Sequence, residues 1–216
     1  MLYSPANGAF LAASEHNEMN NFQEKVNFIW QIAELLRGDF KQSEYGKVIL
    51  PMTVLRRLDY VLEPTKEKVL AKATSIKPTV NEPVREQMLC LSAGCRFYNL
   101  SKFTFSTLLN ETDPNHLAAN LTAYVAGFST DAREIFERFK FGEAVERLRE
   151  ADLLFLVMQR FCDPKIELHP ERTSDLEMGY IFEELIRRFS EQSNETAGEH
   201  FTPREVIGLM VRLLFA

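Results

Sequence analysis

The residues best suited to chemistry lie near the end of the chain, in the stretch G-E-H-F-T-P-R-E-V-I-G-L-M-V at 198–211. Thr202 can accept a hydrogen bond from the backbone N–H of Glu205, whose side chain can reach back to the N–H of Thr202, and Pro203 suits the first helical position. The free N–H groups and the helix dipole attract a carboxylate or a phosphate, and Phe201 adds a flat face. The pattern predicts a site for a small ligand with an acid group and a ring; alternatively, the capping box only begins a surface helix.

Histidines and cysteines give no second site. The histidines are scattered, without the spacing of metal ligands or of a nucleophile and its base, and the odd number of cysteines follows no regular spacing. No C-x-x-C or H-x-x-x-H pattern completes a zinc site. We therefore expect no metal, and thiols buried in a reducing compartment. The residues are His16, His116, His169, His200, Cys90, Cys95 and Cys162.

Composition restricts the kind of protein and its partners. The chain has 216 residues, 45% of them apolar, and a formal net charge of −6, so a folded core is expected. No apolar run approaches the roughly 18 residues that span a membrane. No Lys or Arg precedes Lys25, as the positive region of a signal peptide would require. These features predict a cytoplasmic protein. An acidic chain must share any DNA contact with another protein or confine it to a small area.

Two arginine pairs are the main basic features of the helical part of the chain. Arg56–Arg57 and Arg187–Arg188 both lie in helix-like patterns next to acidic residues. We interpret them as solvated helix surface. Glu183 and Glu184 precede the second pair by one helical turn, which favours ordinary surface ion pairs.

Apolar periodicity predicts a mainly α-helical chain that positions the stretch at 198–211. Residues 1–19 show no sustained period and are interpreted as a flexible arm. From residue 20, apolar residues recur every three to four positions and predict a helix that ends near Gly38. A second helix is predicted through 48–62. Pro51 fits it only in the first turn, where its missing N–H is no loss.

The remaining elements follow from caps, prolines and apolar runs. A short helix is predicted over 65–72, a surface loop over 73–83, and a short strand pair or extended segment over 96–105. Later helices are predicted from Asp113-Pro114 to Gly127, from Ser129 or Thr130, over 143–162 with a buried run at 153–158, from Thr173 or Ser174, and from Thr202 after a polar loop at 190–198.

Three collinear segments carry a resemblance to a known family. The stretch at 198–211 resembles the G-E-(F/Y/H)-(Y/F)-T-P-x-x-V-x-x-L-M-V signature of the M (modification) subunits of type I restriction-modification systems, which are adenine-N6 DNA methyltransferases. N-F-I-W-Q-I-A-E-L-L-R-G-D-F-K-Q-S-E-Y-G-K-V-I-L-P-M-T-V-L-R-R-L-D at 27–59 is similar to the helical N-terminal domain of those subunits. D-L-E-M-G-Y-I-F-E-E-L-I-R-R-F at 175–189 is similar to the helix before their cofactor motif.

The resemblance implies a division of the chain and a cofactor. It implies a helical N-terminal domain over 20–172, followed over 173–216 by the first helix of a truncated α/β methyltransferase domain. The cofactor implied is S-adenosylmethionine, whose methionyl carboxylate and flat adenine agree with the ligand predicted above. The residues that would contribute to its pocket are Glu199, His200, Phe201, Thr202, Pro203 and Arg204.

The resemblance also implies partners and shows what is missing. In the family, two M subunits join one DNA specificity (S) subunit, restriction (R) subunits join that core, and the N-terminal helices help enclose double-stranded DNA. The family's cofactor loop D-P-x-x-G-(S/T)-G and catalytic N-P-P-(F/Y) do not occur here. We therefore expect an N-terminal fragment that carries no catalytic residue and transfers no methyl group, although its full-length parent is an enzyme.

A non-enzymatic helical module is the alternative. In that case the helices over 20–38 and 48–62 would form the core of an interaction module, for instance a helix-turn-helix DNA-binding regulator. A recognition helix presents basic and amide side chains outward, and the second helix offers Arg56 and Arg57 for this role.

Overall fold

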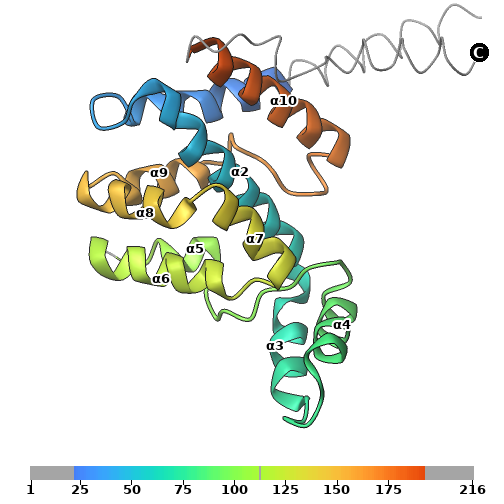
Figure 1. The fold of residues 1–216 in the computed structure, drawn as a ribbon. Helices are drawn as coiled ribbons and strands as arrows, with labels where there is room; N and C mark the ends of the chain where they lie inside the picture. The colour runs from blue at the N-terminus through green and yellow to red at the C-terminus, as the bar shows by residue number, and fades with distance from the viewer. Residues whose placement is uncertain (1–21, 112, 193–216) are drawn as a thin grey trace, which may run out of the picture.

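The computed structural model describes residues 22–111 and 113–192, which are mainly helical (Figure 1). Within these ranges the only strand-like features are two isolated bridges, which pair Arg37 with Phe40 and Asn99 with Phe128. The predicted mainly α fold is confirmed. The elements are a helix over 22–35, a 3₁₀ turn η1 (Gln42–Glu44), α2 (Tyr45–Leu62), η2 (Glu63–Thr65), α3 (Lys66–Ser75), α4 (Glu82–Ala93), α5 (Phe105–Leu108), α6 (Pro114–Ala126), α7 (Thr130–Arg138), α8 (Phe141–Glu150), α9 (Leu154–Phe161) and α10 (Asp175–Gln192).

Helix α2 is the central element of the described part. Helices α8 and α9 pack against one side of it, and α6 lies beyond them. The helix over 22–35 and α10 lie together above its N-terminal half in Figure 1. Helices α3 and α4 form a hairpin that projects from the opposite end of α2 (Figure 1). The last element before the predicted cofactor residues, α10, is thus positioned by the start of the chain and by α2.

The first helix follows the predicted apolar stripe. Val26, Ile29 and Leu36 are fully buried, because residues three and four apart share one face of a helix. Gly38 ends this region with a φ of 101°, a left-handed conformation that favours glycine. The stripe and its predicted end are confirmed.

The sequence favoured a position for Pro51 in the first turn of its helix, but Pro51 does not lie there. Helix α2 begins six residues earlier, at Tyr45, directly after the 3₁₀ turn η1. Pro51 is therefore inside the helix, where it removes one backbone hydrogen bond and normally costs about 3 kcal/mol. Burial of side chains on both sides of it, among them Val48 and Met52, offsets this cost.

The predicted single helix over 143–162 is two helices. Asp152 has a φ of 55° and ends α8 in a Schellman motif, in which Leu153 donates its N–H to the carbonyl of Leu148 at 2.8 Å and Asp152 donates to Arg149 at 3.1 Å. The usual sequence signal for this motif, a glycine, is absent. The apolar run at 153–158 contributes to the core as expected, except for Leu156, which is 43% exposed.

Helix α4 is an element that apolar periodicity did not indicate. The predicted loop over 73–83 is shorter, because α3 continues to Ser75 and α4 begins at Glu82. Asn81 caps α4 by accepting a hydrogen bond from the Val84 N–H at 3.1 Å, and Gly94 ends it with a φ of 72°. Local capping signals were therefore present in the sequence.

Residues 96–104 form an irregular segment with a single bridge at Asn99, not the strand pair that was one of the two predicted alternatives, and lead into the short helix α5. Asn99 fastens this segment to α6 by donating its side-chain amide to the Tyr124 carbonyl at 2.9 Å. Gly127, the predicted end of α6, must be small because a Cβ there would lie 2.8 Å from the Asn99 side chain. The predicted starts of α6, α7 and α10 are confirmed.

A buried carboxylate joins α2 to α5 and α6. Asp59 accepts hydrogen bonds from the Tyr124 hydroxyl at 2.7 Å, the Phe105 backbone N–H at 3.0 Å and the Arg56 guanidinium at 3.0 Å. Burial, and then the negative charge of Asp59, raise the pKa of Tyr124 well above its ordinary value. Tyr124 therefore remains a neutral donor. Because a buried charge needs such partners, Asp59 fixes where α5 and α6 lie.

Three predictions fall outside the described residues: the arm over 1–19, most of the polar loop over 190–198, and the helix from Thr202. The first part of that loop, 190–192, is the last part of α10. No helix in the described ranges is both long enough and apolar enough to cross a bilayer.

Candidate functional site

All six predicted cofactor residues, from Glu199 to Arg204, lie outside the described residues. The structure does describe α10, which ends at Gln192, seven residues before Glu199. The contacts that fix α10 are therefore the part of the candidate site that lies within the described residues.

Lys25 holds the start of α10 from the first helix of the chain. Its side chain is 4% exposed, and its ammonium donates hydrogen bonds to the Thr173 hydroxyl and to the Glu177 carboxylate, both at 2.8 Å. Thr173 is fully buried and in turn donates to the Glu167 carbonyl at 2.5 Å. A buried ammonium needs such partners to offset its lost hydration.

Arg57 of α2 holds the same turn from the other side. One guanidinium nitrogen donates to the backbone carbonyls of Leu168 and Thr173, at 2.7 and 2.8 Å. Another donates to the Asp175 carboxylate at 2.7 Å. The planar guanidinium thus binds the segment before α10 and its first residue together, which a single ammonium could not do.

Aromatic packing holds the other end of α10. The rings of Phe189 and Trp30 lie with their centroids 5.1 Å apart. Gly46 lets α2 approach the Phe189 ring closely, because a Cβ there would already be in contact with it at 3.4 Å. Arg188 donates to the Asn27 side chain at 2.9 Å. Both ends of α10 are therefore fixed by residues of the first two helices.

The arginine pair at Arg56–Arg57 is not solvated surface, contrary to the prediction. Arg56 is 8% exposed and bonded to Asp59, and the side chain of Arg57 is 11% exposed. Arg56 bonds Asp59 and Tyr60 within its own helix, whereas the partners of Arg57 lie more than 100 residues away, which a local pattern cannot show. Arg187 and Arg188 do form the expected ion pairs with Glu184.

Sequence reasoning also missed the role of Lys25. A lysine at this position in a helical pattern is ordinarily exposed. A weak signal existed, since Lys25 immediately precedes Val26 in the apolar stripe and therefore lies near its edge.

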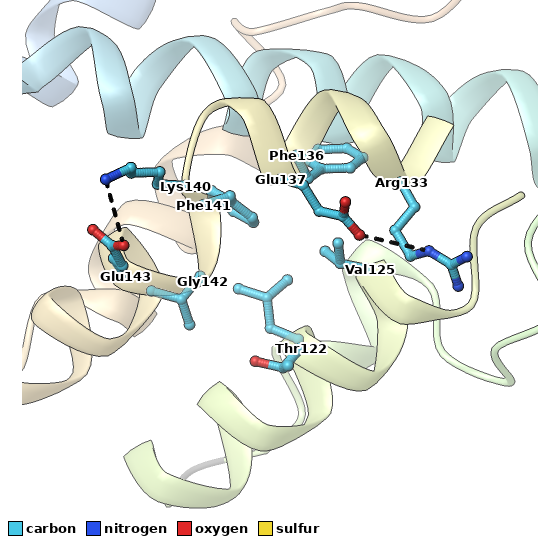
Figure 2. A pocket seen from close by; sticks show the side chains of 11 residues that line it. Thr122, Val125, Arg133, Phe136, Glu137, Lys140, Phe141, Gly142 and Glu143 are labelled. Atoms are coloured by element: carbon cyan, nitrogen blue, oxygen red, sulfur yellow. Dashed lines mark ion pairs between the residues drawn. The ribbon is translucent and has the colours of Figure 1, made fainter. Parts of the chain in front are cut away.

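A hollow of about 320 Å³ lies between α6, α7 and α8 (Figure 2). Ion pairs stand on opposite sides of it in Figure 2, Arg133 with Glu137 and Lys140 with Glu143, each at 3.9 Å. Its lining includes no histidine or cysteine and no hydroxyl paired with a base, so it offers no catalytic constellation. The apolar part of the lining is Leu121, Val125, Phe136, Phe141 and Val145.

The described histidines and cysteines have ordinary surroundings. His116 is largely exposed, and His169 packs its ring edge-on against Tyr60. Burial raises the pKa of the Cys90 and Cys162 thiols, which disfavours the nucleophilic thiolate. No group of three potential metal ligands is present in the described ranges.

Fold and site together define the class of protein. It has a helical domain, and the contacts of this domain hold the first helix of a second region. Residues 25–161 match the family described as HsdM N-terminal domain, and residues 173–216 match the family described as N-6 DNA Methylase. The first match covers more than half of the chain, so the chain belongs to the HsdM N-terminal domain family, the N-terminal part of type I restriction-modification M subunits. Searches of curated proteins and of solved structures gave no match.

Proposed function

We propose that the chain is the N-terminal part of an M subunit whose full-length form transfers a methyl group from S-adenosylmethionine to adenine N6 in DNA. The carrying observation is that the methylase match begins at Thr173, the residue that Lys25 and Arg57 hold at the start of α10. Such a subunit requires a helical domain that fixes the start of its methylase region.

In this proposal the segment from Glu199 to Arg204 contributes to the S-adenosylmethionine pocket. The support comes from sequence: Thr202 and Pro203 begin a helix whose free N–H groups suit the methionyl carboxylate, and Phe201 suits the adenine ring. The match to the methylase family includes all six residues.

The 216 residues by themselves transfer no methyl group in this proposal. Adenine methylation on DNA requires groups that hold the extruded base and its amino group. The N-P-P-(F/Y) motif that does this in the family, and the glycine-rich cofactor loop, do not occur in the sequence.

The helical part over 20–172 serves assembly and DNA enclosure in this proposal, and 173–216 begins the methyltransferase domain. The partners are the S subunit, a second M subunit, the R subunit and double-stranded DNA, and the compartment is the cytoplasm. A net charge of −6 agrees with a chain that contacts DNA only together with partners.

The helix-turn-helix alternative loses its two candidate base-reading side chains. Arg56 is bonded to Asp59 and Tyr60, and Arg57 to Thr173 and Asp175. A recognition helix needs such groups free in the groove.

Isothermal titration with S-adenosylmethionine, together with a radiolabelled methyl-transfer assay on DNA, tests the proposal. We expect weak or no cofactor binding and no transfer by this chain, but transfer to adenine N6 by the complete M subunit assembled with its S subunit. In that assembly, Thr202→Ala weakens cofactor binding about fivefold or more, because a lost helix cap of about 1 kcal/mol corresponds to that factor.

Thr74→Ala is the matched control, since Thr74 is an exposed threonine of α3. The proposal is wrong if the complete assembly transfers no methyl group, or if this chain alone binds the cofactor tightly. Salt-dependent DNA binding by this chain alone would favour the regulator.

A further inference from the structure

We infer, resting on the proposed function, that Lys25 and Arg57 are positioning residues that make α10 part of the helical domain and thereby fix where the methyltransferase region begins. The two family matches leave a gap between residues 161 and 173, where a flexible connection between two domains would be expected. The contacts in the structure indicate the opposite.

Two side chains anchor the segment between the two matches in the core, although much of the segment is exposed. Ile166 and Leu168 are 1% and 0% exposed, so this connection contributes to the core. Arg57 binds the Leu168 carbonyl, and the Thr173 hydroxyl binds the Glu167 carbonyl. A connection anchored by two buried side chains and two such bonds has little freedom to swing.

The cations also determine the direction of α10. Lys25 bonds residues 173 and 177, one turn apart, and Arg57 bonds residues 173 and 175. One contact would allow α10 to rotate, whereas contacts at Thr173 just before the helix and at Asp175 and Glu177 in its first turn define an axis. The contact of Phe189 with Trp30, four turns further on, fixes the same axis at its other end.

These ion pairs differ from the other charged contacts of the surface. Lys140–Glu143 and Arg133–Glu137 are 3.9 Å apart, lie within single helices, and are largely exposed. Exposed pairs of this kind contribute little to stability, whereas removing one partner of a buried pair leaves an uncompensated charge. Among the charged contacts of α10, those of Lys25 and Arg57 therefore hold its start, and the buried side chains of α10, Met178, Ile181, Leu185 and Phe189, add apolar packing.

Hydrogen exchange on the 216-residue chain tests the inference, with Lys25→Met as the variant and Lys140→Met as the matched control. We expect amide exchange in α10 to become at least about tenfold faster in Lys25→Met, because local opening no longer breaks a buried ion pair. Amides of α6 and α8 keep their wild-type rates. Lys140→Met leaves α10 unchanged.

Asp175→Asn is a second variant that does not threaten folding, because the Asp175 side chain is 99% exposed. It removes the charge that Arg57 binds and speeds exchange only in the first turn of α10. Unchanged α10 exchange in both variants, or equally faster exchange throughout the chain, overturns the inference.

A kinetic measurement on the complete M subunit with its S subunit separates positioning from mere stabilisation. Lys25→Met raises the KM for S-adenosylmethionine about tenfold or more with a smaller change in kcat, since misplacing a binding segment by about 1 Å has large effects. Faster α10 exchange with unchanged KM would overturn the positioning role. If the wild-type assembly transferred no methyl group, the proposed function would be refuted instead. The exchange experiment would still decide whether Lys25 and Arg57 hold α10 in place.

Discussion

Several charged residues that the sequence pattern places on the solvated surface instead make contacts that hold the molecule together. Asp59, Arg57 and Lys25 each lie in a helical segment with nothing locally unusual, yet each is buried and bonded to residues 46 to 152 positions away. Buried charges are tolerated only with full hydrogen bonding. These residues therefore specify which segments meet.

The hydrogen bond of the Tyr124 hydroxyl can be tested at the scale of a single residue. Tyr124→Phe removes its hydrogen bond to Asp59 and should lower the free energy of unfolding by about 1–2 kcal/mol, measured by urea denaturation near pH 7. Tyr98→Phe is the control, because the described residues provide no hydrogen-bond partner for that hydroxyl and it is equally buried, at 4% exposure. A loss no larger in Tyr124→Phe than in Tyr98→Phe would contradict the role of the bond.

The same variant has a predictable pH dependence. The pKa of Tyr124 is raised in the folded protein by burial and by Asp59, whereas in the unfolded chain it is about 10. Its contribution to stability is full below pH 10 and decreases as the pH rises above 10, because only the unfolded chain then releases the proton. The difference in stability between wild type and Tyr124→Phe should therefore shrink above pH 10.

Apart from the unpredicted helix α4, the positions where helices begin and end account for the main differences between pattern and structure at the scale of elements. Asp152 ends α8 in the left-handed region without a glycine, and Pro51 lies within α2 rather than at its start. In both places, the packing of neighbouring residues compensates for a backbone conformation that the local sequence disfavours.

Substitution of Asp152 tests the break between α8 and α9. Asp152 is exposed, so its replacement removes little packing and mainly changes the cost of a φ of 55°. Asp152→Gly should leave the melting temperature unchanged or raise it. Asp152→Val should cost about 1–2 kcal/mol, because a β-branched residue is strained in this region. Equal melting temperatures for the two variants would mean that the Schellman turn does not limit stability.

At the scale of the whole molecule, the fold does not divide where the two family matches do. Helix α10 belongs to the methylase match but packs on the helix over 22–35 and on α2. Ile166 and Leu168 anchor the segment before it in the core. The first region of the chain is thus a platform that extends to residue 192.

Trp30, the single tryptophan in the chain, reports on this platform because it contacts Phe189 of α10. Urea unfolding followed by Trp30 fluorescence and by far-ultraviolet circular dichroism should give coincident transitions, as expected when α10 and the other helices unfold together. A fluorescence change at a lower urea concentration than the loss of helix would show that α10 detaches first. Phe189→Ala provides the reference, since it removes the contact and should separate the two curves.

The sequence by itself determined the helical class, the apolar faces and most helix starts, because periodicity of 3.6 and caps are local properties of the chain. It also carried the resemblance that the family matches confirm. Only the tertiary structure decided that Lys25, Arg57 and Asp59 are buried and that α10 is fixed by them. Their partners are distant along the chain. A charged side chain is buried only where hydrogen bonds and ion pairs offset its lost hydration, and these contacts exist only once the distant segments are brought together.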